Sequence, residues 1–290
     1  MSDQAQSLRN LVRSRAQTGG RTTRIVTVTS GKGGVGKSNF TLNFALALQR
    51  QGYRPLVFDA DIGLANIDVL MGVTPKYSLY HLLKREKSIW DIIQRGPNDL
   101  EFIAGGSGFN DLMRLSEAEV DYFADQVNRL DGYVDYILLD TGAGLSKQTL
   151  KFIVSADETI VVTTPEPTAI TDAYAIIKMV HSHDCGVRFQ LVVNRVADAG
   201  EGKHTADKIN LVAKKFLDLD IPTLGYVEDD PNVSKAVKKQ VPFSVAFPHS
   251  PAARSVDRIA WTFVSGQSAP KPQIERGVRR FLDKMMRLLK

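Results

Sequence analysis

A glycine-rich run with two lysines carries the clearest chemistry in the sequence: Gly31-Lys32-Gly33-Gly34-Val35-Gly36-Lys37-Ser38. Glycines let backbone N–H groups turn inward around a phosphate. A lysine at the end of such a run neutralises the β- and γ-phosphates of a nucleotide, and the hydroxyl that follows binds Mg²⁺. The run therefore predicts a loop that binds ATP or ADP with Mg²⁺, through Gly31, Gly33, Gly34, Val35, Gly36, Lys37, Ser38 and Asn39.

Such a loop needs a strand before it and a helix after it, and the sequence predicts both. Arg24 to Ser30 reads as a strand, and Ser38 to Gln51 as a helix. Similar β-branched runs alternate with helical patterns along the chain, which predicts α/β architecture: a single doubly wound, mostly parallel sheet with helices on both faces. The expected strands are Arg24–Thr29, Pro55–Asp59, Leu100–Ile103, Tyr136–Asp140, Thr159–Thr163, Phe189–Asn194 and Thr223–Val227.

The composition fits a soluble, cytoplasmic protein. The chain has 290 residues, 43% of them hydrophobic, and its net charge of +5 does not by itself indicate a nucleic-acid binder. A single cysteine, Cys185, excludes a disulfide framework. No run reaches the roughly 18 apolar residues of a membrane span. We expect an N-terminal segment and tether (1–20), one nucleotide-binding domain (21–265), a linker (266–273) and a terminal helix (274–290).

The position of Lys32 makes the loop more specific. The sequence Lys-Gly-Gly-Val-Gly-Lys-Ser resembles the signature of the MinD/ParA family of deviant Walker A ATPases. In that family the first lysine reaches across a dimer interface to the partner's nucleotide. The resemblance therefore implies an ATPase that forms a homodimer when it binds ATP, with Lys32 and Lys37 in the catalytic site; a solvated loop lysine is the alternative.

Two strands are followed by aspartates that suit this chemistry. A carboxylate at the carboxyl end of a strand faces the ligand crevice of an open α/β sheet. The run from Phe58 to Asp68 is similar to the family's switch I segment, so we expect Asp61 to orient the attacking water and Asp59 to support Mg²⁺. Capping of the next helix is the alternative, above all for Asp59.

A second carboxylate and an amide complete the expected site. Asp140 ends an apolar strand, as a Walker B element requires, and joins Ser38 and Asp59 as a metal candidate. The family usually continues Asp-x-Pro-Ala-Gly, but Gly142 stands at the proline position here, which puts the switch II geometry in doubt. The resemblance also makes Asn194, with Arg195, the contact to the adenine edge; a strand-end turn is the alternative.

The terminal segment has the pattern of a basic amphipathic helix. At 100° per residue its apolar side chains fall on one arc of about 120°, opposite most of its arginines and lysines. Such a helix can bind anionic lipids or dock on the core. Its place after a proline-containing linker resembles the family's membrane-targeting sequence, which favours the membrane, through Ile274, Val278, Phe281, Leu282, Met285, Leu288 and Leu289.

The start of the chain narrows the resemblance. Ala5, Leu8, Leu11 and Val12 recur at helical spacing, and the run Asp3-Gln4-Ala5-Gln6-Ser7-Leu8-Arg9 matches the Asp-Gln-Ala-x-x-Leu-Arg motif of the FlhG (YlxH, FleN) family of flagellar number regulators. That resemblance implies three kinds of partner: a signal-recognition-particle-type GTPase, FlhF, stimulated through Asp3, Gln4, Ala5, Leu8 and Arg9; C-ring and basal-body proteins; and anionic lipids on the inner face of the membrane, where the ATP-bound protein would be peripheral.

Two other classes share the loop. A ParA-like ATPase that partitions DNA is the alternative function, but it needs a basic DNA-facing surface, and we expect no nucleic-acid partner. An iron–sulfur reductase needs more thiolates than Cys185 supplies, which excludes that class.

Overall fold

The computed structural model describes residues 22–61, 66–105, 117–144, 146–266 and 277–289. The predicted N-terminal motif and Ile274 lie outside these residues. So does the side chain of Leu289.

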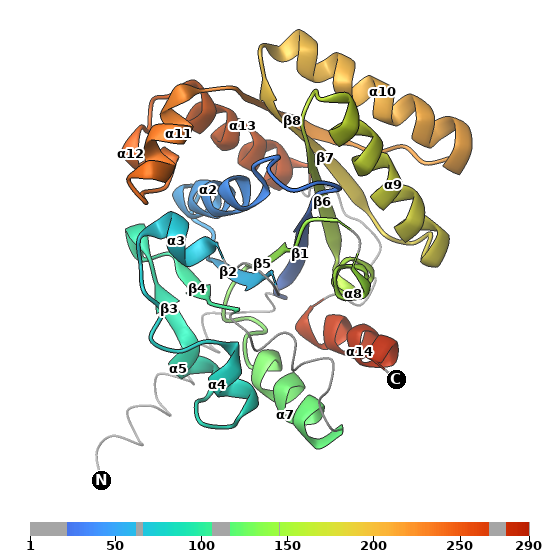
Figure 1. Cartoon of the computed structure of the whole chain (residues 1–290). Helices are drawn as coiled ribbons and strands as arrows, with labels where there is room; N and C mark the ends of the chain where they lie inside the picture. The colour runs from blue at the N-terminus through green and yellow to red at the C-terminus, as the bar shows by residue number, and fades with distance from the viewer. Residues whose placement is uncertain (1–21, 62–65, 106–116, 145, 267–276, 290) are drawn as a thin grey trace.

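One sheet of eight strands forms the centre of the described chain (Figure 1). Every pair of neighbouring strands is parallel except β3 and β4, so the predicted fold class is confirmed. The seven predicted strands are all present, with ends shifted by up to two residues, and β3 was not predicted. In the order β3-β4-β2-β5-β1-β6-β7-β8, the strands span Ile93–Arg95, Glu101–Ile103, Pro55–Ala60, Tyr136–Thr141, Arg24–Thr29, Glu158–Thr163, Phe189–Val196 and Thr223–Glu228.

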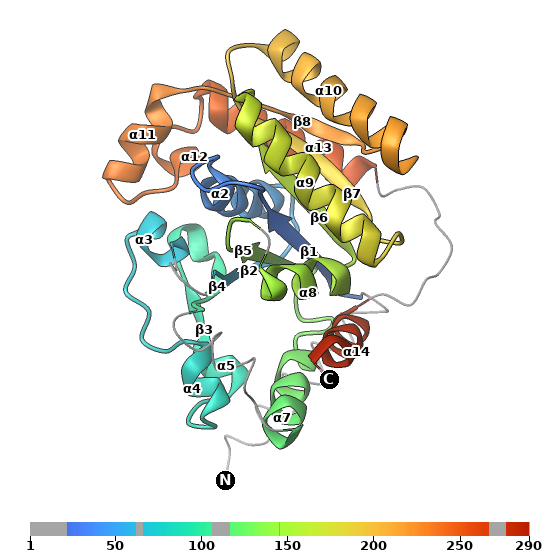
Figure 2. The same ribbon diagram turned by 45° about the vertical axis from the view of Figure 1, so that its right-hand side comes forward.

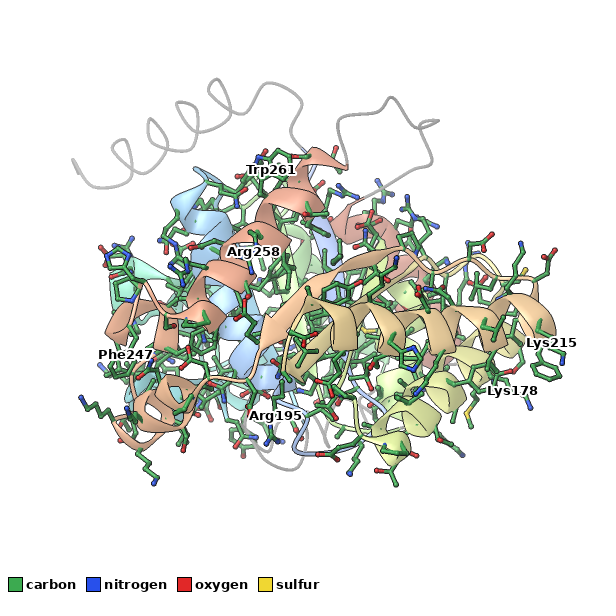
Figure 3. The ribbon with its side chains drawn as sticks, turned by 90° about the horizontal axis from the view of Figure 1, so that it is seen from above. Lys178, Arg195, Lys215, Phe247, Arg258 and Trp261 are labelled. Carbon is green, nitrogen blue, oxygen red and sulfur yellow. The ribbon has the colours of Figure 1, made fainter. Side chains whose placement is uncertain are left out.

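Helices cover both faces of the sheet. One face carries α2 (Lys37–Arg50), α3 (Ile67–Met71), α11 (Pro231–Lys238), α12 (Phe243–Ala246) and α13 (Pro251–Ser265). The other carries α4 (Leu79–Leu83), α5 (Ile89–Ile92), α7 (Glu117–Asn128), α8 (Lys147–Ser155), α9 (Pro167–His183), α10 (Ala199–Leu217) and α14 (Val278–Leu289). A short 3₁₀ turn, η1, spans Pro97–Asp99. Seen from above, the edge strand β8 runs between α13, which carries Trp261, and α10, which carries Lys215 (Figure 3).

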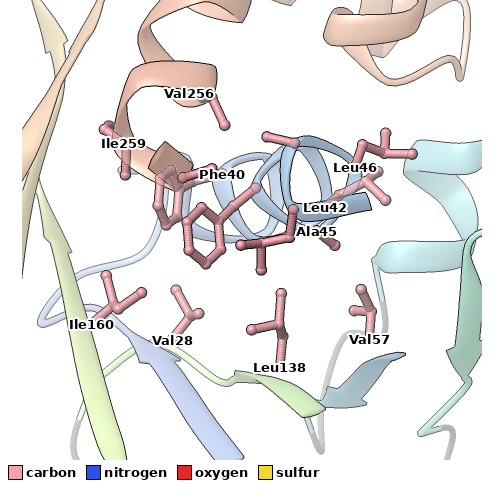
Figure 4. Close-up of a cluster of buried hydrophobic side chains, with 14 of the residues drawn as sticks. Val28, Phe40, Leu42, Ala45, Leu46, Val57, Leu138, Ile160, Val256 and Ile259 are labelled. Carbon is pink, nitrogen blue, oxygen red and sulfur yellow. The ribbon is translucent and has the colours of Figure 1, made fainter. Parts of the chain in front are cut away.

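The buried strands supply side chains to both layers because successive residues point to opposite faces. Val28 of β1 packs with Phe40 of α2 and Val256 of α13 (Figure 4). Val26 belongs to the same cluster, whereas Ile25 belongs to the cluster on the other face. Strands buried on both faces are rich in β-branched residues, and in β1 every residue after Arg24 is Ile, Val or Thr. This packing fixes β1 and α2 on either side of the glycine-rich loop.

The sheet order places the loop at a ligand-binding position. β1 lies between β5 and β6. The strands β2 to β5 lie on one side of β1, and the strands β6 to β8 lie on the other. Open α/β sheets bind ligands outside the carboxyl ends of their strands at such a switch point. Loops after β1, β2, β5 and β7 therefore meet at one edge.

The C-terminal helix α14 docks on the core between α7 and α8 (Figures 1 and 2). Its apolar residues Val278, Phe281, Leu282 and Met285 are at most 5% exposed. Phe281 stacks on Phe152 of α8, with ring centroids 6.5 Å apart. Docking, the alternative left open by the sequence, is therefore the arrangement that this structure shows; membrane binding stays a prediction and requires α14 to leave.

Candidate nucleotide site

The glycine-rich loop has the backbone of a phosphate cradle. Gly34 and Gly36 have φ of 84° and 88°, a left-handed conformation that glycine adopts without strain. Gly36 is the N-cap of α2 and no side chain caps that helix, so its first N–H groups point to an anion site. Gly31 packs on α9: a Cβ there would lie 2.2 Å from the carbonyl carbon of Asp172, which only glycine avoids.

The loop lysine is held under the loop by a buried ion pair. Lys37 Nζ donates to Asp140 Oδ1 at 2.8 Å, and the two side chains are 7% and 1% exposed. The hydroxyl of Thr41, one turn further along α2, donates to the same oxygen at 2.8 Å. Asp140 thus fixes the Lys37 ammonium group at the carboxyl end of β5, beside the loop.

Asp59, at the end of β2, lies beside Asp140 in the sheet, and the two residues are register partners. Its carboxylate accepts backbone N–H groups from Asp61, Asn66 and Ile67, so it caps the start of α3. Burial and, next, the negative charge of Asp140 raise the pKa of Asp59 to about 7 despite these bonds. The capping alternative is therefore observed, and the charge of Asp140 acts on the Asp59 carboxyl from the neighbouring strand.

The oxygen atoms at this point fit a magnesium ion. Asp140 Oδ2 is buried and has no hydrogen-bond partner among the described residues, although its other oxygen has two. Lys37 Nζ lies 3.2 Å from the Ser38 hydroxyl, which places that hydroxyl at the same spot. Carboxylate and hydroxyl oxygens are the ligands that Mg²⁺ prefers. A cation would relieve both the unpaired oxygen and the repulsion that raises the pKa of Asp59.

The two switch segments meet next to the loop. Asp61 lies against Gly142, where an added Cβ would stand 3.5 Å from Asp61 Oδ1, an ordinary contact. Gly144 has a φ of 78° and donates its N–H to Ser30 O at 2.8 Å. With Gly142 at the position of the family proline, the segment after β5 is still bonded, through Gly144, to the residue that precedes the phosphate loop. The Asp61 carboxylate lies beside Gly142.

The side chain of Lys32 bonds to the start of α9. Its Nζ donates to Glu166 Oε2 and to the Thr168 hydroxyl, both at 3.0 Å, at the start of α9. Its side chain is 38% exposed, and the bond from Lys32 holds the pKa of Glu166 below its usual value. Lys32 is thus a surface side chain held by two groups of its own chain. Both bonds that its Nζ donates join it to the start of α9.

A cavity of about 250 Å³ opens beside the loop on the α2 and α13 face. Asn194 at the end of β7 donates to Val35 O at 2.8 Å and so joins this strand end to the loop. Arg195 has a φ of 58° inside β7, where the register with β8 shifts between Asn194 and Val196, so this point is an irregularity within the strand and not the strand-end turn that the sequence left open. The cavity lies where a nucleoside would extend from the cradle; it is lined by Gly34, Gly36, Asn39, Phe40, Asn194, Arg195, Val227, Glu228, Asp229, Asp230, Val233, Ser234, Phe243 and Val256.

Sequence reasoning missed the partners of the site lysines. Thr41 could have been found, because it lies one helical turn after Lys37 on α2. Glu166 and Thr168 follow β6 at the ligand edge, which is the one signal that could have identified them. Val233, Phe243 and Val256 lie in α11 to α13, and no motif marks them.

Comparison with known proteins agrees with this geometry. The model of the CobQ/CobB/MinD/ParA nucleotide binding domain matches residues 26–243, most of the chain. The chain belongs to this family. Among its relatives, the flagellum site-determining protein YlxH of Helicobacter pylori is 38% identical over 270 residues, covering 92% of this chain and 91% of YlxH. The antiactivator FleN of Pseudomonas aeruginosa is 34% identical over 258 residues, covering 89% and 91%.

Solved structures show the same fold. MinD from Pyrococcus horikoshii, determined with Mg-ADP, superposes with a TM-score of 0.69 at 24% identity, covering 86% of this chain and all of that one. A ParA family ATPase from Chlorobium tepidum gives a TM-score of 0.66 at 21% identity, covering 83% and 99%. This MinD/ParA chain is therefore of the FleN/YlxH type by sequence and MinD-like in its fold.

Proposed function

We propose that this protein is an ATP-hydrolysing switch that forms a homodimer with ATP, binds the inner face of the cell membrane through α14, and regulates flagellar number or placement. The observation that carries the proposal is a basic amphipathic helix docked by its apolar face on the domain that bears the phosphate loop. The name of one relative, the flagellum site-determining protein YlxH, supplies the flagellar context.

In the proposed hydrolysis the chain binds the phosphates and places the water. The N–H groups of the loop surround the β- and γ-phosphates, and Lys37 exchanges Asp140 for a phosphate oxygen. Ser38, Asp59 and Asp140 would hold Mg²⁺, which would supply positive charge beside the phosphates. Asp61, beside Gly142, orients the attacking water, so that positioning more than proton removal is its contribution.

Dimerisation would use Lys32. The ion pair to Glu166 is between exposed groups and contributes little, so a partner's nucleotide can attract Lys32 away from it. The nucleotide site of each chain would then be completed by a lysine of the other. This accounts for a phosphate-loop lysine that bonds to the start of α9.

Membrane binding requires α14 to undock. Its apolar face packs against α7 and α8, and two of its cations are paired with the core: Arg280 lies 3.6 Å from Asp157 Oδ1, and Lys284 lies 3.3 Å from Asp184 Oδ2. A docked α14 can offer lipid neither this apolar face nor these two charges. Dimerisation would place two such helices side by side, and their avidity would link ATP to membrane affinity.

The remaining partners are proposed from the N-terminal motif and from the flagellar relatives. Asp3, Gln4, Ala5, Leu8 and Arg9 would stimulate an FlhF-type GTPase, and C-ring and basal-body proteins would receive the signal. The protein would be cytoplasmic with ADP and peripheral on the membrane with ATP. Among the described residues, no helix has the length and apolarity needed to cross a membrane.

Vesicle co-sedimentation with Leu288→Asp tests the proposal. Leu288 is 42% exposed on docked α14, so a charge there should leave the docked state folded but weaken lipid insertion, by about tenfold. Leu211→Asp is the matched control, because Leu211 is 70% exposed on α10, away from α14.

Wild type and the Leu211 variant should sediment with phosphatidylglycerol vesicles better with ATP than with ADP. Equal capture with both nucleotides, or wild-type capture of the Leu288 variant, would contradict the membrane role. Stronger ATP-dependent capture by DNA than by vesicles would favour the DNA-partitioning alternative.

A further inference from the structure

The groove that holds α14 is an apolar surface of the core. Its lining includes Ile25 of β1, Phe123 and Val127 of α7, Leu130 after α7, and Phe152 of α8, all at most 8% exposed while α14 is in place. Asp157 and Asp184 add negative charge at its side, where they meet Arg280 and Lys284. Departure of α14 for the membrane would expose this lining to water, which is unfavourable for a continuous apolar patch.

The N-terminal segment attaches at the mouth of the same groove. Thr23 is fixed there, because its hydroxyl donates to Val134 O at 2.6 Å and its N–H donates to Asp131 Oδ1 at 3.1 Å. Thr22 lies beside Gly277, the residue before α14: a Cβ added at Gly277 would stand 2.8 Å from Thr22 Cγ2. Residues 1–21 and α14 therefore start from one point.

The sequence of the N-terminal segment matches what the groove accepts. Leu8, Leu11 and Val12 have the spacing of Val278, Phe281 and Leu282 in α14. Arginines at 9, 13 and 15 suit the two aspartates at the side of the groove. Nine residues lie between Val12 and Thr22. These ten residue steps reach roughly 33 Å when extended, about twice the length of a helix the size of α14. A tether this short keeps the segment at an effective concentration of about a millimolar.

We infer that the N-terminal segment around Leu8, Leu11 and Val12 occupies the groove when α14 leaves it for the membrane. The inference rests on the proposed function, since it needs α14 to undock. Exchange of one amphipathic segment for the other keeps the lining covered in both states. It also makes the two appendages competitors: a partner that captures residues 3–9 frees the groove, so α14 docks again and membrane binding weakens.

Cross-linking to the native cysteine tests this exchange in the full chain. Cys185 is exposed and follows Asp184, the partner of Lys284, so it marks the side of the groove. Ser7→Cys places a second thiol next to Leu8, and a short bismaleimide joins the two if the segment enters the groove. The matched control is the same chain with Leu8→Asp and Leu11→Asp, and Cys185→Ser defines the background.

Two routes free α14 independently. Anionic vesicles with ATP do so by the proposed function. Arg280→Glu with Lys284→Glu does so in solution, by setting like charges against Asp157 and Asp184 without changing the apolar core. Hydrogen exchange of residues 278–289 reports the release in either case. By either route the cross-link yield of the Ser7→Cys chain should rise about tenfold, because the N-terminal segment would then occupy the groove in most chains and not in a small minority. The yield of the Leu8/Leu11 control should not rise.

The outcomes separate the two proposals. A rise with the double glutamate variant but no capture by vesicles would retain the exchange and reject the membrane function. Vesicle capture or solution release of α14 with no rise in cross-link yield would overturn the exchange. An equal rise in the Leu8/Leu11 control would also overturn it, because the contact would then not depend on the apolar residues.

Discussion

Replacing Asp59 by asparagine should remove a pH-dependent loss of stability from the ligand-free protein. Asp59 is 1% exposed, and burial and the Asp140 charge raise its pKa from 3.8 to about 7. Because the folded pKa is raised, the folded chain binds a proton that the unfolded chain has released. The contribution of Asp59 to the free energy of unfolding therefore falls as pH rises, from the unfolded pKa up to the folded one.

The size of the effect follows from the two pKa values. One pKa unit corresponds to 1.36 kcal/mol. Between pH 5 and pH 8, ionisation of Asp59 should lower the free energy of unfolding of the wild type by about 2 to 3 kcal/mol relative to the variant. The variant also loses stability at every pH, including pH 5, because it loses hydrogen bonds. Its single amide oxygen cannot replace two carboxylate oxygens that accept three N–H groups.

Urea denaturation at several pH values without Mg²⁺ measures this difference directly. The gap between wild type and Asp59→Asn should change steadily from pH 5 to pH 8 in favour of the variant. Saturating Mg-ADP should abolish the pH dependence of the gap, because the cation neutralises the pair in the wild type. A constant gap across this range would refute the assigned environment of Asp59, whatever the absolute stabilities.

Three further substitutions test the loop and its surroundings. Lys32→Ala should abolish ATP-dependent dimerisation measured by light scattering while leaving the melting temperature within about 2 °C, since its ion pair is exposed; a normal dimer would remove Lys32 from the interface. Asp61→Ala should keep the ATP-bound dimer but lose at least about tenfold in phosphate release, and unchanged turnover would reject its role. Gly31→Ala should abolish nucleotide binding by calorimetry, because a Cβ would lie 2.2 Å from the Asp172 backbone, whereas Gly33→Ala meets nothing within 4 Å and should fold and melt normally.

The sequence was sufficient for most of the sheet because buried parallel strands are continuous β-branched runs. β1 and β6 follow that rule, since every residue after the first is Ile, Val or Thr. The edge strand β3 does not: its three residues include Gln94 and Arg95, and it exists only because β4 pairs with it. Short edge strands depend on a partner more than on their own composition.

In the candidate site, too, local motifs predicted some features, and contacts between distant residues determined others. Local motifs were enough to expect Lys37 and Asp140 at one edge of the sheet, where the structure pairs them. The contacts of Lys32 with Glu166 and Thr168 join residues more than 130 positions apart, which no local motif shows. The docking of α14 was beyond sequence pattern, because an amphipathic face suits lipid and protein equally. Whether the helix docks depends on the groove that contains Phe152, and residues far apart in the sequence form that groove.

Helix α9 has a consequence for what the chain can tolerate. Glu166, the N-cap of α9, holds Lys32, and the second turn, at Asp172, packs on Gly31. At the C-cap, Asp184 holds Lys284 of α14. Its 17 residues make a rod of about 25 Å between nucleotide loop and terminal helix. One inserted residue would turn the far end by about 100° and carry Asp184 away from Lys284, with the near end unchanged. The contacts of α9 with Lys32 and with Lys284 therefore both depend on the length of this helix.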